Sequence, residues 1–188
     1  METFCDVPVP EFRDGKPITA DEWKILKLVD YWQFFISPTF ADLGTKSGRI
    51  HRLNNWLRWV AQRGNTTKRY LIYVVRWEHG EIGGRPHCHL FLGGMKQVTN
   101  FISMSFILRH DWRQRHGHCD VRLFERAQLV KGANYIGGRC GVYTTDRSDV
   151  DWAKNRYEIG KFGKADTVHF SQHAEEVLQQ IQNKAATA

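Results

Sequence analysis

Cysteine is scarce in this sequence, and its four cysteines lie far apart. Cys5, Cys88, Cys119 and Cys140 form no CxxC pair, which excludes a zinc ribbon and offers no disulfide framework. We therefore expect a reducing, cytoplasmic setting. Long apolar runs are also missing, and the first residues lack the apolar stretch of a signal peptide. These absences predict a protein with no membrane partner.

Proline is scarce as well, and three of the five prolines lie in residues 1–18. This segment has little hydrophobic periodicity, so we expect an irregular N-terminal arm. With 188 residues, 41% of them hydrophobic, the chain can bury one sizeable core but hardly two. We expect a single domain over residues 1–188, which ends in a C-terminal helix and tail at 171–188.

Acidic residues are fewer than basic ones, with 20 Asp and Glu against 27 Lys and Arg, a formal net charge of +7. A basic surface attracts polyanions, so nucleic acid is the first partner to consider, although a solvated surface also explains such an excess. Trp56 and Trp59 are candidates for stacking on bases. The candidate phosphate-binding cations are Arg49, Arg52, Arg109, Arg113, Lys161 and Lys164.

Hydrophobic periodicity predicts an α+β chain. Thr19 and Glu22 have the spacing of a capping box, which predicts a helix that continues to about Tyr31. The other expected helices are 46–63, 96–115, 125–138 and 171–183, and the expected strands are 33–40, 68–78, 85–92 and 118–124, with a turn and a strand before 171. This order predicts a largely antiparallel sheet with helices packed on it.

Two histidines lie two residues apart in the expected strand RPHCHLFL. Successive side chains of a strand point to opposite faces, so His87 and His89 share one face and Cys88 lies on the other. Such a pair is most often a surface or core feature, but it can also bind one metal ion. A zinc site is a weaker hypothesis for a second group, because its spacing is irregular. That group consists of His110, His116, His118 and Cys119.

Glu78 is the candidate for a third metal ligand. A two-residue turn at Gly83-Gly84 would place Glu78 opposite His89, on the face of both histidines. A slip of one residue, or a three-residue loop, would present His79 instead. Two imidazoles and a carboxylate leave coordination positions open, which is typical of a catalytic site that accepts Mg²⁺ or Mn²⁺.

A second group of reactive residues lies on the helix expected at 125–138. Lys131, Tyr135 and Arg139 are spaced four residues apart, so a phenol lies between two cations on one helix face. A tyrosine in this setting usually packs its ring and solvates its hydroxyl. Several glycines disfavour helix in this segment, so we expect a short one. Tyr143 is the alternative reactive tyrosine, although the glycine two residues before it indicates that the helix has ended.

The segments WEHGEIGGRPHCHLFL and VKGANYIGGRCGVY together resemble the HUH endonuclease superfamily, specifically its single-tyrosine initiators of rolling-circle replication. FFISPTF is similar to that family's first motif, so the likeness covers about Gln33 to Tyr143. The resemblance implies a ferredoxin-like (split βαβ) antiparallel sheet that carries the HxH pair and faces a helix with the nucleophilic tyrosine. The chain departs from the family at Gly138, where a lysine is usual, and Arg139 follows it.

The activity that this resemblance implies is site-specific nicking and rejoining of single-stranded DNA to start replication of a plasmid or virus. Tyr135 would form a 5′-phosphotyrosine intermediate, assisted by Lys131 or Arg139. The metal ligands would be His87, His89 and Glu78, and the ion Mg²⁺ or Mn²⁺.

The implied partners are origin DNA, single-stranded or folded as a hairpin, and a separate helicase, because the sequence has no GxxxxGK[ST] loop. The host would be bacterial or archaeal, or the setting would be the host nucleus for a eukaryotic virus. Two alternatives stay open. One is a transposase or relaxase with the same chemistry, and the other is a non-catalytic nucleic-acid-binding domain of ferredoxin-like fold.

Overall fold

The computed structural model describes residues 12–13, 16–42, 44–79, 86–137 and 168–187. Its centre is an open, five-stranded antiparallel sheet with strand order β6-β3-β5-β4-β7. The strands are β3 (Trp32–Pro38), β4 (Ile72–His79), β5 (Pro86–Gly93), β6 (Cys119–Leu123) and β7 (Val168–Phe170). The expected α+β class with an antiparallel sheet is therefore confirmed.

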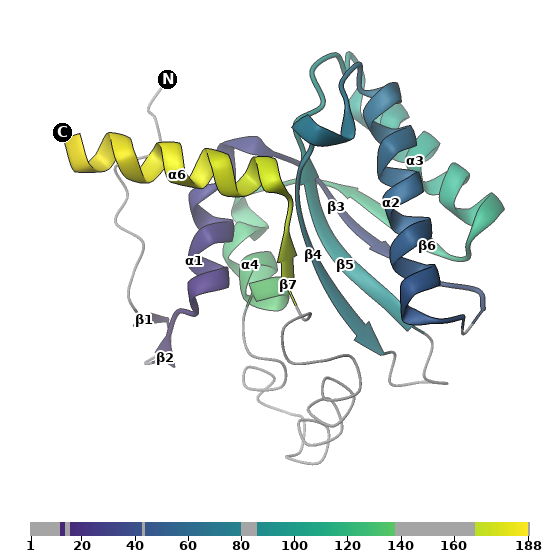
Figure 1. The fold of residues 1–188 in the computed structure, drawn as a ribbon, viewed down its shortest axis with the longest axis horizontal. Helices are drawn as coiled ribbons and strands as arrows, with labels where there is room; N and C mark the ends of the chain where they lie inside the picture. Colours follow the sequence, from purple (N-terminus) through teal and green to yellow (C-terminus); the bar gives the residue numbers. More distant parts are fainter. Residues whose placement is uncertain (1–11, 14–15, 43, 80–85, 138–167, 188) are drawn as a thin grey trace.

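Helices cover both faces of this sheet (Figure 1). One face carries α2 and α3, and the other carries α1, α4 and α6, so the molecule has three layers. The helices are α1 (Ala20–Lys27), α2 (Lys46–Arg63), α3 (Phe101–Arg115), α4 (Leu129–Gly137) and α6 (Gln172–Thr187). No helix in the described part of the chain is long and apolar enough to cross a membrane.

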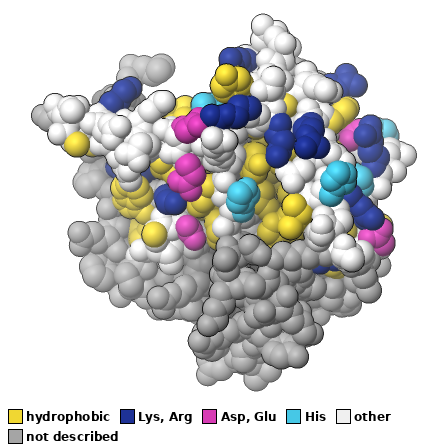
Figure 2. Space-filling view, in the orientation of Figure 1, with side chains coloured by type: hydrophobic (Ala, Val, Ile, Leu, Met, Phe, Trp, Pro, Cys, Tyr) yellow, Lys and Arg dark blue, Asp and Glu magenta, His cyan; other side chains and the backbone are white. Residues whose placement is uncertain are grey.

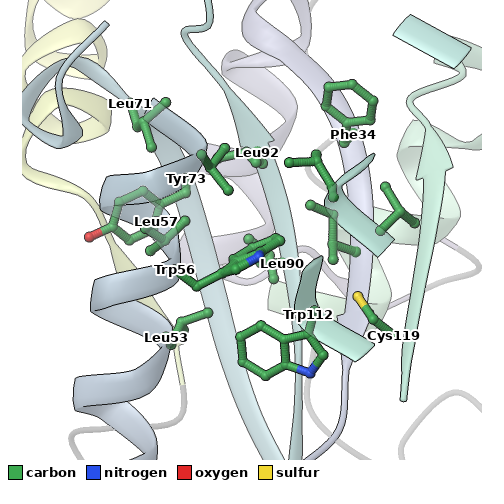
Figure 3. Close-up of a cluster of buried hydrophobic side chains, with 14 of the residues drawn as sticks. Phe34, Leu53, Trp56, Leu57, Leu71, Tyr73, Leu90, Leu92, Trp112 and Cys119 are labelled. Carbon is green, nitrogen blue, oxygen red and sulfur yellow. The ribbon is translucent and has the colours of Figure 1, made fainter. Parts of the chain in front are cut away.

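The larger hydrophobic cluster lies between the sheet and the layer of α2 and α3. Figure 3 shows Trp56 and Leu57 of α2 directed toward the strands, where Leu90 and Tyr73 lie. Trp56 is 2% exposed, whereas Ile50 on the same helix is 36% exposed. Trp56 is therefore a core residue, and its expected role in base stacking is wrong.

The second cluster lies on the other face of the same strands. Phe91 of β5 and Val74 of β4 point into it, while Leu90 and Val75, their chain neighbours, belong to the first cluster. Phe91 stacks on Trp32, with ring centroids 5.4 Å apart. Buried strands that alternate between two cores read as continuous apolar runs, which explains YLIYVV and HLFL.

Side-chain caps determine where three helices begin. Thr19, Thr45 and Asn100 each accept a hydrogen bond from the backbone N–H three residues later. The cap at Asn100 explains why α3 starts at Phe101 and not near residue 96, as expected. The helix expected to reach Tyr31 ends at Lys27 and continues as a 3₁₀ turn, Val29–Tyr31.

Two further expectations need correction. The strand expected from residue 68 begins at Ile72, because Lys68–Tyr70 forms a 3₁₀ turn. The N-terminal arm is not wholly irregular, since two short strands, β1 (Phe12–Arg13) and β2 (Lys16–Pro17), pair with each other. The helix expected over 125–138 is short, as predicted: a 3₁₀ turn, Arg126–Gln128, precedes the nine residues of α4.

Candidate active site

The two histidines of β5 lie side by side on the face that α4 covers. The ring centroids of His87 and His89 are 4.9 Å apart, and the rings are nearly perpendicular. Cys88 between them is fully buried in the cluster on the opposite face. The strand periodicity thus places both imidazoles together, as the sequence predicted.

Tyr135 lies in the last turn of α4, directly over the second of these histidines. Its hydroxyl is 3.1 Å from Nε2 of His89, and the two ring centroids are 4.7 Å apart. The tyrosine ring is 47% exposed, whereas His89 is 8% exposed. A buried imidazole therefore contacts the hydroxyl of an exposed tyrosine.

Both ring nitrogens of His89 have a hydroxyl neighbour. Ser37 of β3 places its Oγ 2.8 Å from Nδ1, while Tyr135 lies at Nε2. Phe35, also on β3, stacks against the imidazole with ring centroids 6.1 Å apart. These contacts determine the position and the plane of the ring. A histidine on a free surface would not have such contacts.

α4 can approach the sheet closely because it has a glycine over Phe91. A Cβ atom at Gly132 would lie 2.6 Å from the Phe91 Cζ atom, nearer than side chains pack. The glycine thus permits a separation between helix and sheet that alanine would prevent. This close approach brings the tyrosine, one turn further along, to His89.

The C-terminal end of α4 is held by side chains from two other elements. Arg76 of β4, which is 2% exposed, donates from Nη1 to the carbonyl oxygens of Tyr135 and Ile136. Thr19 donates from Oγ1 to the carbonyl oxygen of Gly137 at 2.6 Å.

Burial raises the pKa of Asp21, in the first turn of α1, and the charge of nearby Arg76 opposes this shift.

The pairing of β4 with β5 differs from the expected hairpin. Arg76 lies opposite His89, and Glu78 lies opposite His87. The expected pairing of Glu78 with His89, which a tight turn at Gly83-Gly84 requires, is wrong by two positions, because the ladder is not centred on these glycines.

A shift of two positions keeps each residue on its original face of the sheet. The register position of Glu78 is therefore still on the face shared by the histidine positions, and that of His79 is on the other face. The side chains of Glu78 and His79 lie outside the described residues. Among the side chains that are described, no group of three or more His, Cys, Asp and Glu could hold a metal ion.

The expected cations near the tyrosine have different outcomes. Lys131 is exposed on α4, one turn before Tyr135. Arg139, the alternative tyrosine Tyr143, and the candidate cations Lys161 and Lys164 lie outside the described residues. Of the expected catalytic group, the structure thus describes Lys131 and Tyr135 on one short helix.

The remaining candidate phosphate-binding cations lie on the opposite layer. Arg49 and Arg52 belong to α2, and Arg109 and Arg113 to α3. Arg49 is buried and donates to the Gly44 carbonyl. Figure 2 shows Lys and Arg side chains on the upper right of the visible face, where Figure 1 places α2 and α3. These four residues are therefore not gathered around Tyr135.

The three cations other than Arg49 also contact other parts of the chain. Arg52 forms an ion pair with Asp42, and Arg109 donates to the Val121 carbonyl on the edge strand β6. Arg113 lies 3.4 Å from His118.

The four residues considered for a zinc site lie in surroundings that differ from one residue to the next. Cys119 is fully buried in the larger core, where desolvation raises the pKa of its thiol to about 12. His116 packs its ring against Trp112, with centroids 4.8 Å apart. Cys119 and His116 thus lie in the core and at its margin, whereas His110 and His118 are exposed.

Sequence reasoning missed three residues that support the site, namely Ser37, Arg76 and Thr19. Ser37 lies in FFISPTF, two residues after Phe35, so strand periodicity places both side chains on one face of the sheet. This pattern gave only a weak signal that Ser37 belongs to the site. Arg76 is a cation that directly follows the apolar run LIYVV, a pattern that indicates a buried partner. Thr19 is recognisable as a helix cap, but not as a donor to a second helix.

The sequence matches no protein-family model, and comparisons with curated proteins and with solved structures gave no match. A function therefore has to be inferred from the chain's own residues.

Proposed function

We propose that this chain is a metal-dependent endonuclease that nicks and rejoins single-stranded DNA, with Tyr135 as its nucleophile. The observation that carries the proposal is the 3.1 Å separation between Tyr135 Oη and His89 Nε2. The two residues are 46 positions apart and come from a helix and a strand. An exposed phenol beside a pair of potential metal ligands is an arrangement suited to phosphoryl transfer to tyrosine.

Two imidazoles and a carboxylate are a donor set that a divalent metal ion accepts. His87 and His89 would hold it, and Glu78 is the proposed third ligand from its register position opposite His87. Ser37 Oγ contacts Nδ1 of His89, so the other ring nitrogen, Nε2, is the one that faces Tyr135. A bound Mg²⁺ or Mn²⁺ would withdraw charge from the scissile phosphate as a Lewis acid.

The chain's own part in the reaction is nucleophilic attack. Tyr135 Oη forms a bond to phosphorus in line with the 3′ oxygen, whose bond to phosphorus breaks. The phenol gives up its proton to solvent, and the departing 3′ oxygen takes up a proton. The DNA 5′ end stays on the tyrosine as a phosphodiester, and the free 3′-hydroxyl can attack it in reverse to reseal the strand.

Deprotonation of the phenol is the demanding part of this step, since a free tyrosine has a pKa of about 10. A neighbouring positive charge favours the phenolate. We assign this role to Lys131, which is exposed on the same helix, and propose the same role for Arg139.

The order of elements supports a ferredoxin-like fold as part of the proposal. The succession β3-α2-β4-β5-α3-β6 has the pattern β-α-β-β-α-β, and its strands lie in the order β6-β3-β5-β4. In this arrangement the histidines lie on an inner strand, and β7 is an additional edge strand.

The proposed biological role is initiation of rolling-circle replication. The substrate would be origin DNA of a plasmid or virus, single-stranded or in a hairpin, and a separate helicase would unwind the duplex. The protein would act in the cytoplasm of a bacterial or archaeal host, or in the nucleus for a eukaryotic virus.

The test is formation of a covalent adduct by the full chain. The protein is incubated with a labelled circular single-stranded DNA several kilobases long and Mn²⁺, and the products are separated in SDS after nuclease digestion. We expect a labelled protein band that Tyr135→Phe abolishes and EDTA prevents. Tyr70→Phe is the matched control, because Tyr70 is 50% exposed and lies outside the site, on the turn before β4.

Four results separate the alternatives. An adduct that persists in Tyr135→Phe would rule out this nucleophile, and full activity of His87→Ala would rule out the metal site. DNA binding without any adduct would support a non-catalytic binding domain. Adduct formation that is restricted to mobile-element or transfer-origin sequences would favour a transposase or relaxase.

A further inference from the structure

Three successive backbone carbonyl groups at the end of α4 accept hydrogen bonds from side chains of other elements. Arg76 Nη1 is 2.9 Å from the oxygen of Tyr135 and 3.0 Å from that of Ile136, and Thr19 Oγ1 is 2.6 Å from that of Gly137. The last carbonyls of a helix have no partner within the helix. Here two buried or half-buried donors occupy them, beside the tyrosine itself.

The two donors are themselves held in place. Arg76 lies on β4 directly opposite His89, so its guanidinium reaches α4 from the strand next to the imidazole. Thr19 is the N-cap of α1, and its hydroxyl accepts the Glu22 N–H at 3.1 Å while it donates to Gly137. Both hydrogen-bonding functions of this hydroxyl are in use, which determines its rotamer.

The helix that they hold has little stability of its own. α4 has nine residues, and Gly132 and Gly137 lie within it. A helix of this length is marginal without tertiary contacts. At Gly137, a Cβ atom would lie 2.5 Å from the backbone nitrogen of Glu22, so α1 and α4 meet backbone to backbone at this end.

We propose that Arg76 and Thr19 are positioning residues that keep the hydroxyl of Tyr135 at His89. Their hydrogen bonds with α4 go to its backbone carbonyl oxygens, so their proposed action is through the position of the tyrosine. The inference rests on the proposed function for its consequence in catalysis. An error of about 1 Å in the position of a reacting group can lower a rate by about 100-fold, so small movements of α4 matter.

The kinetic test uses two pairs of variants of the full chain. Thr19→Val removes the donor at nearly constant volume, and Thr19→Ser restores it; Arg76→Met removes the charge and donors, and Arg76→Lys keeps a donor. We expect Thr19→Val to slow single-turnover adduct formation about tenfold, with the Kd for a single-stranded oligonucleotide within about twofold of wild type. Thr19→Ser should recover most of the rate.

Equal adduct rates for wild type and Thr19→Val would overturn the proposal, and so would a parallel loss of DNA affinity. Arg76→Met removes a buried cation and its folding is therefore checked by circular dichroism. Thr19→Val, on a half-buried cap, keeps the test valid if Arg76→Met does not fold.

A second measurement does not depend on catalysis. In protein labelled with ¹⁵N-histidine, Tyr135→Phe removes the hydroxyl at His89 and identifies the ring signals that sense it. We expect Thr19→Val and Arg76→Met to move the same signals in the same direction. Signals at the wild-type positions in both variants would show that neither residue positions the tyrosine.

The two failures can therefore be told apart. If wild type forms no adduct but the His89 signals move in the variants, the proposed function is wrong and the positioning holds. If wild type forms the adduct and neither rate nor signals change, the positioning is wrong and the function stands.

Discussion

The imidazole of His89 joins three elements through one side chain. Ser37 of β3 contacts one ring nitrogen, Tyr135 of α4 contacts the other, and Phe35 stacks on the ring. An imidazole with a hydroxyl group at each ring nitrogen and an aromatic ring stacked on it has little freedom to rotate. The surroundings of the proposed nucleophile, Tyr135, therefore include a tightly held imidazole.

Burial alters the acid–base behaviour of another single residue, Cys119. Its pKa is raised to about 12, chiefly because the thiolate would be desolvated. The unfolded thiol ionises near pH 8.5, so the unfolded chain releases a proton that the folded chain retains as pH rises from about 8.5 to 12. We predict a loss of folding free energy in this window of up to about 1.4 kcal/mol per pH unit from this group.

Urea unfolding of wild type and Cys119→Ala at several pH values measures this contribution. The loss between pH 8 and 10.5 should be smaller in the variant, although the variant is less stable at neutral pH. Val121→Ala is the control, because Val121 lies on the same strand in the same cluster and cannot ionise. Parallel pH profiles for wild type and Cys119→Ala would contradict the prediction.

How far single residues can be predicted from sequence depends on the range of their contacts. His87 and His89 were predictable as neighbours, because strand periodicity is local. Thr19 was predictable as a helix cap, but its second partner is 118 residues away. The contact of Arg76 with α4 likewise depends on how a helix docks on the sheet, which no local pattern contains.

Among the elements, α4 is the one whose placement depends most on a missing side chain. Gly132 faces the ring of Phe91, which is itself packed against Trp32, Phe35 and Phe124. The ring has little space to move aside. We predict that Gly132→Ala lowers the free energy of unfolding by about 1–3 kcal/mol through overpacking.

The sign of this effect makes it diagnostic, because the same substitution in an exposed helix raises stability by about 1 kcal/mol. Gly48→Ala in α2 is the control: the one atom near its Cβ position is Thr45 Oγ1 at 3.2 Å, so we expect a change smaller than about 1 kcal/mol. Thermal and urea unfolding measure both variants. A stabilised Gly132→Ala would show that α4 does not rest on Phe91.

Most elements were predictable from the sequence, whereas their ends and pairing were less so. α2 has the expected bounds, since Thr45 and Gly64 mark its two ends. The register of β4 and β5 was not predictable, because it depends on the connection between them and not on the strands. Period-2 alternation nevertheless placed Glu78 on the correct face, since an even shift preserves it.

The whole molecule has two hydrophobic cores that share one sheet. Val74 belongs to the core under α1, α4 and α6, and its neighbour Val75 to the core under α2 and α3. If the sheet unfolds on one face, the apolar side chains of the core on its other face also become exposed. We predict that the chain unfolds in one cooperative transition. Val74→Ala and Val75→Ala should each lower the free energy of that same transition by about 1–3 kcal/mol, and with it the midpoint.

Near-UV and far-UV circular dichroism measure this behaviour together. Trp32 reports on one core, and Trp56 and Trp112 on the other. The two signals should change at the same denaturant concentration in wild type and in both variants. A variant in which the tryptophan signal splits into two steps would show that the layers unfold independently.

The alternation of β5 also has a consequence for chains that misfold. If this strand shifted by a single residue, His87 and His89 would move to the sheet face that Cys88 and Leu90 occupy. Two imidazoles would then be buried in the larger hydrophobic core. Such a chain would be both unstable and without its proposed metal ligands. The proposed activity thus depends on correct strand register, because only chains with the native register of β5 place both histidines at the site.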